Sequence, residues 1–369
     1  MNLESATNDD ALVVALLAYR TSGLQRARLL DLVRARRGFE RVSAADLREW
    51  GFPALSAAVD SRSARADVRA DVARWARDQI TVLPYGSPWY PELLLSISDP
   101  PLVLFVLGGA VAEVLRKPTI GIVGSRRGDS MGCAFAGEVG REFARRGGTV
   151  VSGLAVGIDG AAHRGALQGD LAGSTVAVLG SGFYSIYPAM NRPLARELVS
   201  RGGLLVSQFE PAVKPYPANF LNRNRVIAGL SLGVLVVQAA ARSGALVTAR
   251  CALDAGRELL VVPGGIRDPL FAGSNGLLRV GAVPVTSLDE LFESFPVSLA
   301  PVQTALSPVA LSSSQIRILN SLPRGEPTPL AAVVPQGGED IHGDLLALEL
   351  EGFIERLPGE LIQVVRDIS

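Results

Sequence analysis

A short loop of glycine, serine and arginine is the first place where this sequence could bind an anion. It reads GSRRG over residues 124–128 and joins the apolar run 119–123 to a helix expected over 130–146. Backbone N–H groups at the start of a helix favour phosphate, Gly124 permits close approach, and Arg126 can add a bidentate charged contact. The loop therefore predicts a phosphate site. A tight turn with two solvated arginines is the alternative.

Three further segments repeat this pattern of small residues and hydroxyls after an apolar run. Neither the dinucleotide fingerprint GxGxxG nor the phosphate-loop pattern GxxxxGK[ST] is present, so generic phosphate contacts are favoured over NAD or ATP, and no cofactor is predicted. The segments contain Ser152 and Gly153, then Gly180, Ser181 and Gly182, and finally Ser243, Gly244 and Thr248.

The stretch 214–225 interleaves aromatic, basic and amide side chains. Aromatic faces stack on bases while arginine neutralises phosphates, which is the combination that binds single-stranded nucleic acid. The alternative is a loop whose Phe220 belongs to the core and whose arginines form salt bridges. The residues in question are Lys214, Asn219, Phe220, Arg223 and Arg225.

Asp159 and His163 could in principle do acid–base chemistry, because residues four apart share a helix face. Asp159 is most simply a helix N-cap. No second carboxylate, cysteine or serine stands at a matching spacing, so a structural Asp–His pair is the expectation. The chain has two histidines and two cysteines, none at ligand spacing, and no metal is predicted.

The segments that carry these residues alternate regularly between strand and helix from residue 119 onward. Near-continuous runs of Val, Ile and Leu predict a parallel sheet covered by helices on both faces, an α/β fold whose ligands bind at the carboxyl ends of the strands. The strands are expected over 119–123, 149–153, 174–180, 204–209, 233–239 and 258–264.

The segments before and after this region differ from it in composition and in hydrophobic periodicity, which predicts separate domains. We expect a small helical module over residues 1–80, the domain with the parallel sheet over 81–295, a linker rich in Pro, Ser and Ala over 296–310, and a winged-helix domain over 311–369. The last is expected as two helices followed by a hairpin that turns at Pro358-Gly359.

Charge is balanced over the whole chain but not along it. Residues 116–257 carry 17 basic and 8 acidic side chains, residues 1–115 carry 13 and 14, and residues 258–369 carry 6 and 14. A basic centre is typical of an anion-binding domain. No apolar run approaches the roughly 18 residues of a membrane span, and the first residues lack a signal-peptide pattern, so a cytoplasmic protein without a membrane partner is expected.

Five ordered motifs over about residues 80–290 closely resemble the DNA-processing protein A family (DprA, also called Smf). They are GSR, VSGLAxGID with AAHxGAL, VAVLGSG with IYP, NFxNRNRxIAGL, and SGALVTA with GRELLVVPG. The resemblance implies an extended Rossmann-like domain that binds single-stranded DNA, forms homodimers, protects incoming DNA in natural transformation and loads the RecA recombinase. It also implies a small N-terminal helical domain, SAM-like or a degenerate helix-hairpin-helix, and a C-terminal winged helix.

The resemblance also assigns roles to single residues. Arg126 would contact phosphate, Phe220 would stack on a base, and Lys214 is the only lysine near that aromatic. Asp159 and His163 belong to a structural motif. The full predicted DNA-binding set is Gly124, Ser125, Arg126, Arg127, Ser152, Gly153, Gly180, Ser181, Gly182, Lys214, Asn219, Phe220, Arg223, Arg225, Ser243, Gly244 and Thr248.

Two other functions compete with that of a non-catalytic DNA-binding protein. A related Rossmann-like group hydrolyses nucleotides and carries PGGxGTxxE, whereas residues 263–269 here lack the GT and the glutamate. A duplex-binding regulator would use the winged helix, but its second helix carries Asp340, Asp344, Glu349 and Glu351, which repel phosphate. We therefore predict no enzyme activity. The expected partners are single-stranded DNA, RecA and a second copy, with other recombination or single-strand-binding proteins as further candidates.

Overall fold

The computed structural model forms two compact units, Met1–Val302 and Gln303–Ser369. The predicted linker 296–310 lies outside the described residues. The structure describes residues 9–21, 25–109, 111–169, 171–295, 311–323, 327–330, 341–350, 353–357, 359 and 361–364.

A nine-stranded sheet in the order β1-β2-β6-β5-β4-β3-β7-β8-β9 forms the centre of the first unit. The strands from β6 to β9 in that order run parallel, while β2 pairs antiparallel with β6, and β1 antiparallel with β2. The predicted α/β class with an extended, mostly parallel sheet is confirmed. The strands are β1 (Ile80–Pro84), β2 (Val103–Leu107), β3 (Thr119–Val123), β4 (Thr149–Ser152), β5 (Thr175–Leu179), β6 (Leu204–Ser207), β7 (Gly233–Val236), β8 (Glu258–Val261) and β9 (Val283–Pro284).

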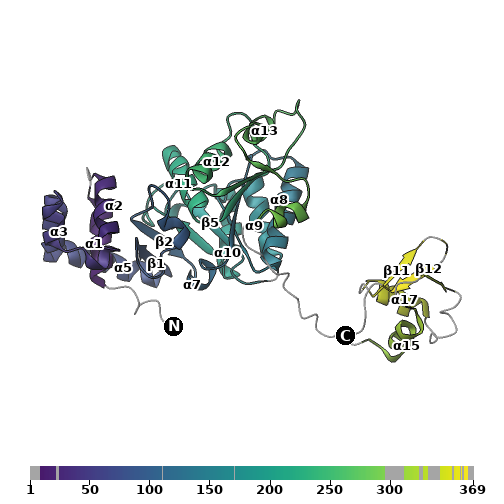
Figure 1. Ribbon diagram of the computed structural model, residues 1–369. Helices are drawn as coiled ribbons and strands as arrows, with labels where there is room; N and C mark the ends of the chain where they lie inside the picture. The colour runs from purple at the N-terminus through teal and green to yellow at the C-terminus, as the bar shows by residue number, and fades with distance from the viewer. Residues whose placement is uncertain are drawn as a thin grey trace. The chain divides into compact units, whose positions relative to one another are not determined.

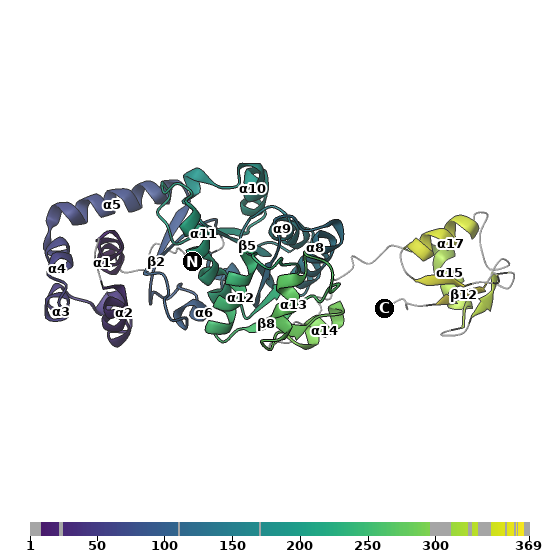
Figure 2. The same ribbon diagram turned by 90° about the horizontal axis from the view of Figure 1, so that it is seen from above.

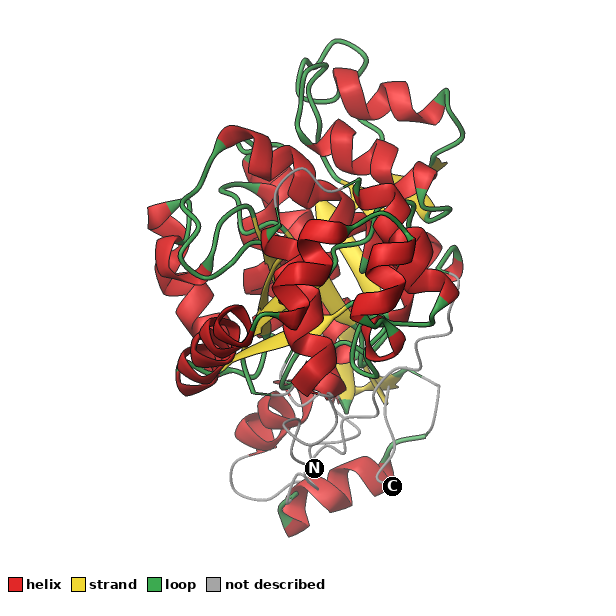
Figure 3. Ribbon diagram, turned by 90° about the vertical axis from the view of Figure 1, so that its left-hand side faces the viewer, coloured by secondary structure: helices red, strands yellow, loops and turns green. Residues whose placement is uncertain are grey.

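Helices cover both faces of this sheet, as Figures 2 and 3 show. Because side chains alternate along a strand, Ile120 and Ile122 pack with α8 and α9, whereas Val234 and Val236 face the layer of α11 and α12. The helices are α6 (Glu92–Leu95), α7 (Val111–Val114), α8 (Ser130–Arg145), α9 (Ile158–Leu167), α10 (Arg192–Ser200), α11 (Pro217–Gly229), α12 (Ala245–Asp254), α13 (Ala272–Leu278) and α14 (Leu288–Glu293).

The N-terminal helices pack directly against the antiparallel edge of the sheet (Figure 1). Phe105 of β2 makes edge-to-face contacts with Tyr19 and Trp75, with ring centroids 5.9 and 5.3 Å apart. The predicted module 1–80 is therefore not a separate compact unit, because it shares one hydrophobic core with the sheet. Its helices are α1 (Asp9–Arg20), α2 (Arg26–Ala35), α3 (Ala44–Glu49), α4 (Pro53–Asp60) and α5 (Arg62–Arg77).

The second unit has its own small core and a three-stranded sheet in the order β10-β12-β11. Its helix, strand, helix and hairpin follow the predicted order with β10 added, and the winged-helix assignment stays a prediction. Pro358, Asp340 and Glu351 lie outside the described residues. The elements are α15 (Ser313–Ser321), β10 (Thr328–Pro329), α17 (Ile341–Leu350), β11 (Ile354–Leu357) and β12 (Leu361–Val364).

None of the helices in the described ranges is both long enough and apolar enough to span a membrane.

Candidate functional site

The strand order places a topological switch point between β3 and β7, because the chain proceeds from β3 toward β6 on one side and from β7 toward β9 on the other. In such sheets a ligand crevice opens beyond the carboxyl ends of the two strands. A cavity of about 520 Å³ lies there, between the loops after β3 and β7 and one side of α11. Nine members of the predicted DNA-binding set line it, and so does Asp159 of the predicted structural motif: Gly124, Ser125, Arg126, Arg127, Phe220, Arg223, Ser243, Gly244 and Thr248.

The loop after β3 is held rigidly by its backbone while both of its arginine side chains stay exposed. Ser125 donates its N–H to the Gln238 carbonyl at 2.7 Å, and its hydroxyl accepts the Arg127 N–H at 3.0 Å. Gly124 is required for packing, since an added Cβ would lie 2.7 Å from Cγ1 of Ile158. Arg126 and Arg127 therefore project from a fixed turn.

The start of α8 differs from the expectation that its N-terminus binds phosphate. Asp129 caps the helix and accepts the Gly132 N–H at 2.7 Å. This hydrogen bond is the main reason why the pKa of the Asp129 carboxyl is lowered, which keeps a negative charge at the helix start. A carboxylate therefore occupies the N-terminus of α8, and Arg126 and Arg127 are the cationic side chains that this loop exposes to solvent.

The loop after β7 contributes small residues and one further cation. Gly244 is exposed, and an added Cβ there would meet nothing within 4 Å. The Ser243 hydroxyl accepts the Ala245 N–H at 3.2 Å, and the buried Asn224 amide of α11 donates to the Gly244 carbonyl at 3.3 Å. Arg242 is exposed at the same rim. It was missing from the predicted set, although it directly precedes the SGALVT motif.

Phe220 of α11 lies half-buried at the junction of this cavity with a smaller one of about 50 Å³. Its ring centroid lies 5.5 Å from that of Tyr187 and 5.9 Å from the guanidinium carbon of Arg126. Gly180 lies against the ring, because a Cβ there would come within 2.6 Å of Phe220 Cδ1. Gly180 thus makes room for the aromatic ring, and its contact with DNA stays a prediction. Tyr187 was missed, although it stands in the IYP motif.

Arg223 is buried, with 5% of its surface exposed, instead of extending into solvent. Its Nη1 donates to the Gly153 carbonyl at 2.7 Å and also to the Val178 carbonyl. Gly153 has no room for a side chain, because its Cβ would lie 2.6 Å from Arg223 Nη1. Burial lowers the pKa of Arg223 to about 10, so it stays cationic at neutral pH. It supplies positive charge from beneath the cavity.

Asp159 and His163 do not form the predicted pair. Gly157 precedes the first residue of α9, and the Asp159 carboxylate accepts the N–H groups of Gly153 and Ala155 at 3.1 and 3.4 Å. Burial raises the pKa of Asp159, and the nearby Arg223 opposes this rise. His163 Nδ1 instead lies 2.7 Å from the Thr175 hydroxyl. Each residue therefore makes its own structural contacts, and of the two only Asp159 lines the cavity.

His163 predicts a specific pH dependence of stability. Burial lowers its pKa from 6.5 to about 3 in the folded protein, so between these values the unfolded chain binds a proton that the native state does not. The resulting stability is complete above pH 6.5 and falls by up to about 1.4 kcal/mol per pH unit as the pH decreases. Urea unfolding at about pH 7 and pH 5.5 should show a smaller loss for His163→Gln than for wild type and for His342→Gln. Equal losses in all three would contradict the assignment.

Several other predicted residues make structural contacts instead of lining the cavity. The Ser152 hydroxyl donates to the Ile122 carbonyl at 2.6 Å and the Ser181 hydroxyl to the Ser185 carbonyl at 2.9 Å, both from buried positions. Gly182 packs beneath the carbonyls of Glu210 and Pro211. Hydroxyls and glycines serve close packing as well as ligand approach, so the role of these three residues in DNA binding stays a prediction.

The remaining members of the predicted set lie on or near α11. Lys214 is exposed, and neither it nor Asn219 is among the residues that line the two cavities. Arg225 bonds to Gln208 and Asp99 and does not line them either, and Thr248 lines the larger cavity although it is only 2% exposed. In the described ranges no group of His, Cys, Asp or Glu could hold a metal ion.

Comparisons with known proteins point to one protein family. Residues 81–296 match the family model of DNA recombination-mediator protein A. Protein Smf of Escherichia coli is 40% identical over 294 residues, covering 77% of this chain and 78% of that protein. DNA processing protein DprA of Bacillus subtilis is 39% identical over 225 residues, covering 61% and 74%.

Two solved structures share both fold and sequence. DNA processing protein A from Streptococcus pneumoniae superimposes with a TM-score of 0.64 at 28% identity, covering 77% of this chain and 98% of that one. A structure concerned with the single-stranded DNA binding mode of DNA processing protein A from Helicobacter pylori gives a TM-score of 0.52 at 28% identity, covering 58% and 94%.

Proposed function

Because the chain belongs to the DNA recombination-mediator protein A family, we propose that its first compact unit binds single-stranded DNA in the cavity between β3 and β7. The observation that carries this proposal is the juxtaposition of exposed arginines with a half-buried aromatic ring. Arg126 and Phe220 come from segments almost a hundred residues apart, yet the Arg126 guanidinium carbon lies 5.9 Å from the ring centroid. Stacking of a base beside a neutralised phosphate needs this pairing.

The residues around the cavity have different roles in the proposed binding. Arg126, Arg127 and Arg242 are exposed around the cavity and are available to phosphates. The Phe220 ring offers a stacking surface, and Arg223 adds charge from below. Gly244 leaves open space for a backbone to approach. Asp159 also lines this cavity, but its carboxylate accepts two backbone N–H groups while His163 is paired with Thr175, which supports binding over catalysis.

The finer assignments rest on family membership. We propose that the protein works as a homodimer in the cytoplasm, protects incoming single strands and loads RecA recombinase during transformation and recombination. We also propose that the C-terminal unit is a winged helix that contacts a protein instead of DNA, because Asp344 and Glu349 lie on its helix α17 and would repel phosphate.

Binding of the full chain to oligo-dT and to a duplex of equal length, over a series of salt concentrations, tests the proposal. We expect tighter binding of the single strand at every salt concentration. The logarithm of its affinity should fall by about 0.7 per phosphate contact for each unit of log salt. Preference for the duplex, or no salt-dependent binding at all, would refute the proposed function.

A further inference from the structure

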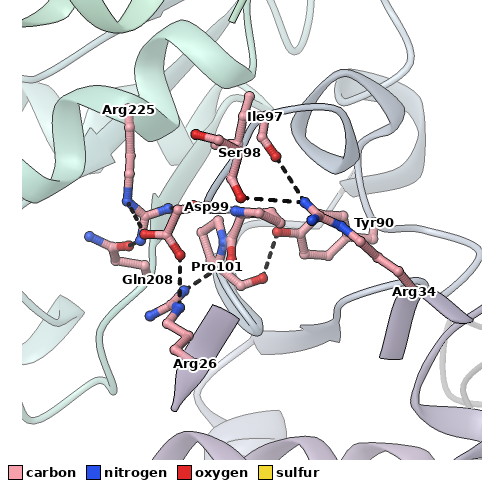
Figure 4. Close-up of polar contacts among 10 residues, drawn as sticks. Arg26, Arg34, Tyr90, Ile97, Ser98, Asp99, Pro101, Gln208 and Arg225 are labelled. Atoms are coloured by element: carbon pink, nitrogen blue, oxygen red, sulfur yellow. Dashed lines mark hydrogen bonds and ion pairs between the residues drawn. The ribbon is translucent and has the colours of Figure 1, made fainter. Parts of the chain in front are cut away.

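A polar network joins the N-terminal helices to α11 through the segment 97–101 (Figure 4). From α2, Arg34 donates to the Ile97 carbonyl at 3.2 Å and Arg26 to the Pro100 carbonyl at 2.9 Å. The Tyr90 hydroxyl closes the segment by donating to the Pro101 carbonyl at 2.7 Å. Hydrogen bonds from α2 therefore hold the segment 97–101 at Ile97 and Pro100, and Tyr90 holds it at Pro101.

Asp99 stands between two arginines from opposite sides of this junction. Its Oδ1 lies 2.9 Å from Nε of Arg26, and its Oδ2 lies 3.4 Å from Nε of Arg225. Arg225 also donates to the backbone carbonyl of Asp99 and, at 2.6 Å, to Oε1 of Gln208. The carboxylate therefore compensates two cations that would otherwise face each other.

The same face of α11 is held at a second point, one helical turn further along. Residues four apart share a helix face, so Gly229 lies on the side of Arg225. A Cβ at Gly229 would come within 2.5 Å of Leu94 Cδ1 and 3.1 Å of Ile97 Cγ2. Helix α11, which carries Phe220 and Arg223, therefore packs against α6 and the segment 97–101 at two points. One is the close approach of Gly229 to Leu94 and Ile97, and the other is the ion pair of Arg225 with Asp99.

We propose that Asp99 is a positioning residue for DNA binding: by joining Arg26 to Arg225 it holds α11 in the orientation that presents Phe220 to the cavity. The N-terminal helices then set the affinity of a site that they do not line. This inference rests on the proposed function, and it moves Arg225 from the DNA contacts to the scaffold. Without the carboxylate, Arg26 and Arg225 would repel each other, and α11 would shift away from its seat.

The direction in which Asp99→Asn changes the affinity for DNA distinguishes a positioning role from an effect of net charge alone. Removing a negative charge favours a polyanion by charge alone, whereas loss of positioning weakens binding. We expect oligo-dT affinity of the full chain to fall about three- to tenfold, which lies toward the low end of the coupling found between contacting residues, with an unchanged salt slope. Asp99→Glu, which keeps the charge, should recover part of the loss.

Asp60→Asn is the matched control. Asp60 is an exposed acid of the same N-terminal layer, 3.5 Å from Arg48, and its loss removes the same charge without touching the junction. The affinity of the Asp60→Asn variant for oligo-dT should equal or slightly exceed that of wild type. Unchanged or tighter binding by Asp99→Asn would overturn the inference.

Two further variants keep the test decisive if Asp99→Asn unfolds. Arg26→Gln replaces a side chain that is 41% exposed, and it should weaken binding of oligo-dT. Combining it with Asp99→Asn should add little to the loss, and additive losses would contradict a shared contact.

Arg225→Gln should weaken binding of oligo-dT without changing the salt slope. A slope reduced by about 0.7 would place Arg225 on a phosphate and refute its role here. If wild type itself fails to bind oligo-dT, the proposed function falls instead.

Discussion

Phe220→Ala should weaken binding of oligo-dT by about 1–3 kcal/mol while the protein stays folded, as expected for the loss of one stacked base. The ring is half-buried, with Gly180 against it and Tyr187 edge-on at 5.5 Å, so its orientation is set before DNA arrives. A pre-oriented ring loses little side-chain entropy on binding. Titration of fluorescently labelled oligo-dT with wild type and variant measures the difference, and thermal unfolding verifies the fold.

Two matched variants separate stacking from packing at this position. Phe220→Leu keeps an apolar side chain but removes the ring face, so it should lose nearly as much affinity as alanine. Gly180→Ala places a Cβ 2.6 Å from Phe220 Cδ1 and should displace the ring, weakening binding although Phe220 is present. Normal affinity in a folded Phe220→Ala protein would show that the ring only fills space.

Arg126→Ala should reduce both the affinity for oligo-dT and its salt dependence. In the described part of the chain no ion pair links the exposed Arg126 to a carboxylate, so its guanidinium is available to phosphate. Loss of one phosphate contact should lower the slope of log affinity against log salt by about 0.7 for a single strand. Affinity measured at four or more salt concentrations gives this slope directly.

Arg145→Ala is the control for the change in net charge. Arg145 is exposed in the last turn of α8, about 24 Å along the helix from its start beside the Arg126 loop. Its removal should leave the salt slope unchanged. If both variants reduce the slope equally, Arg126 acts through the general field of the domain and makes no direct contact.

Much of the fold was predictable because it depends on local patterns. The strands β3–β8 appear as short runs of Val, Ile and Leu bounded by glycine, and their helices as amphipathic stretches. β1 was missed because Ile80–Pro84 is short and ends in proline, so it looked like the start of a connection. The common core of α1, α5 and β2 was missed because Tyr19, Trp75 and Phe105 meet only in three dimensions.

The candidate site was predictable in its cations and its aromatic, but not in the roles of its small residues. Arg126, Arg127 and Phe220 stand out by type and spacing, and they do meet at one cavity. The sequence around Gly153 and Gly180 does not distinguish a glycine that lets a phosphate approach from one that makes room for another side chain. Their partners Arg223 and Phe220 lie 70 and 40 positions away, beyond the reach of any local pattern.

By itself the sequence determined the fold class, the family and the presence of a basic, aromatic segment, since each follows from residue types and their order. Only the tertiary structure decided which of the candidate side chains face the cavity. Strand order sets the switch point between β3 and β7, and the packing of α11 against β5 and the segment 97–101 turns Arg223 and Arg225 inward while Phe220 reaches the cavity. Neighbours on one helix thus receive different environments, because the direction of each side chain depends on contacts with segments distant in the chain.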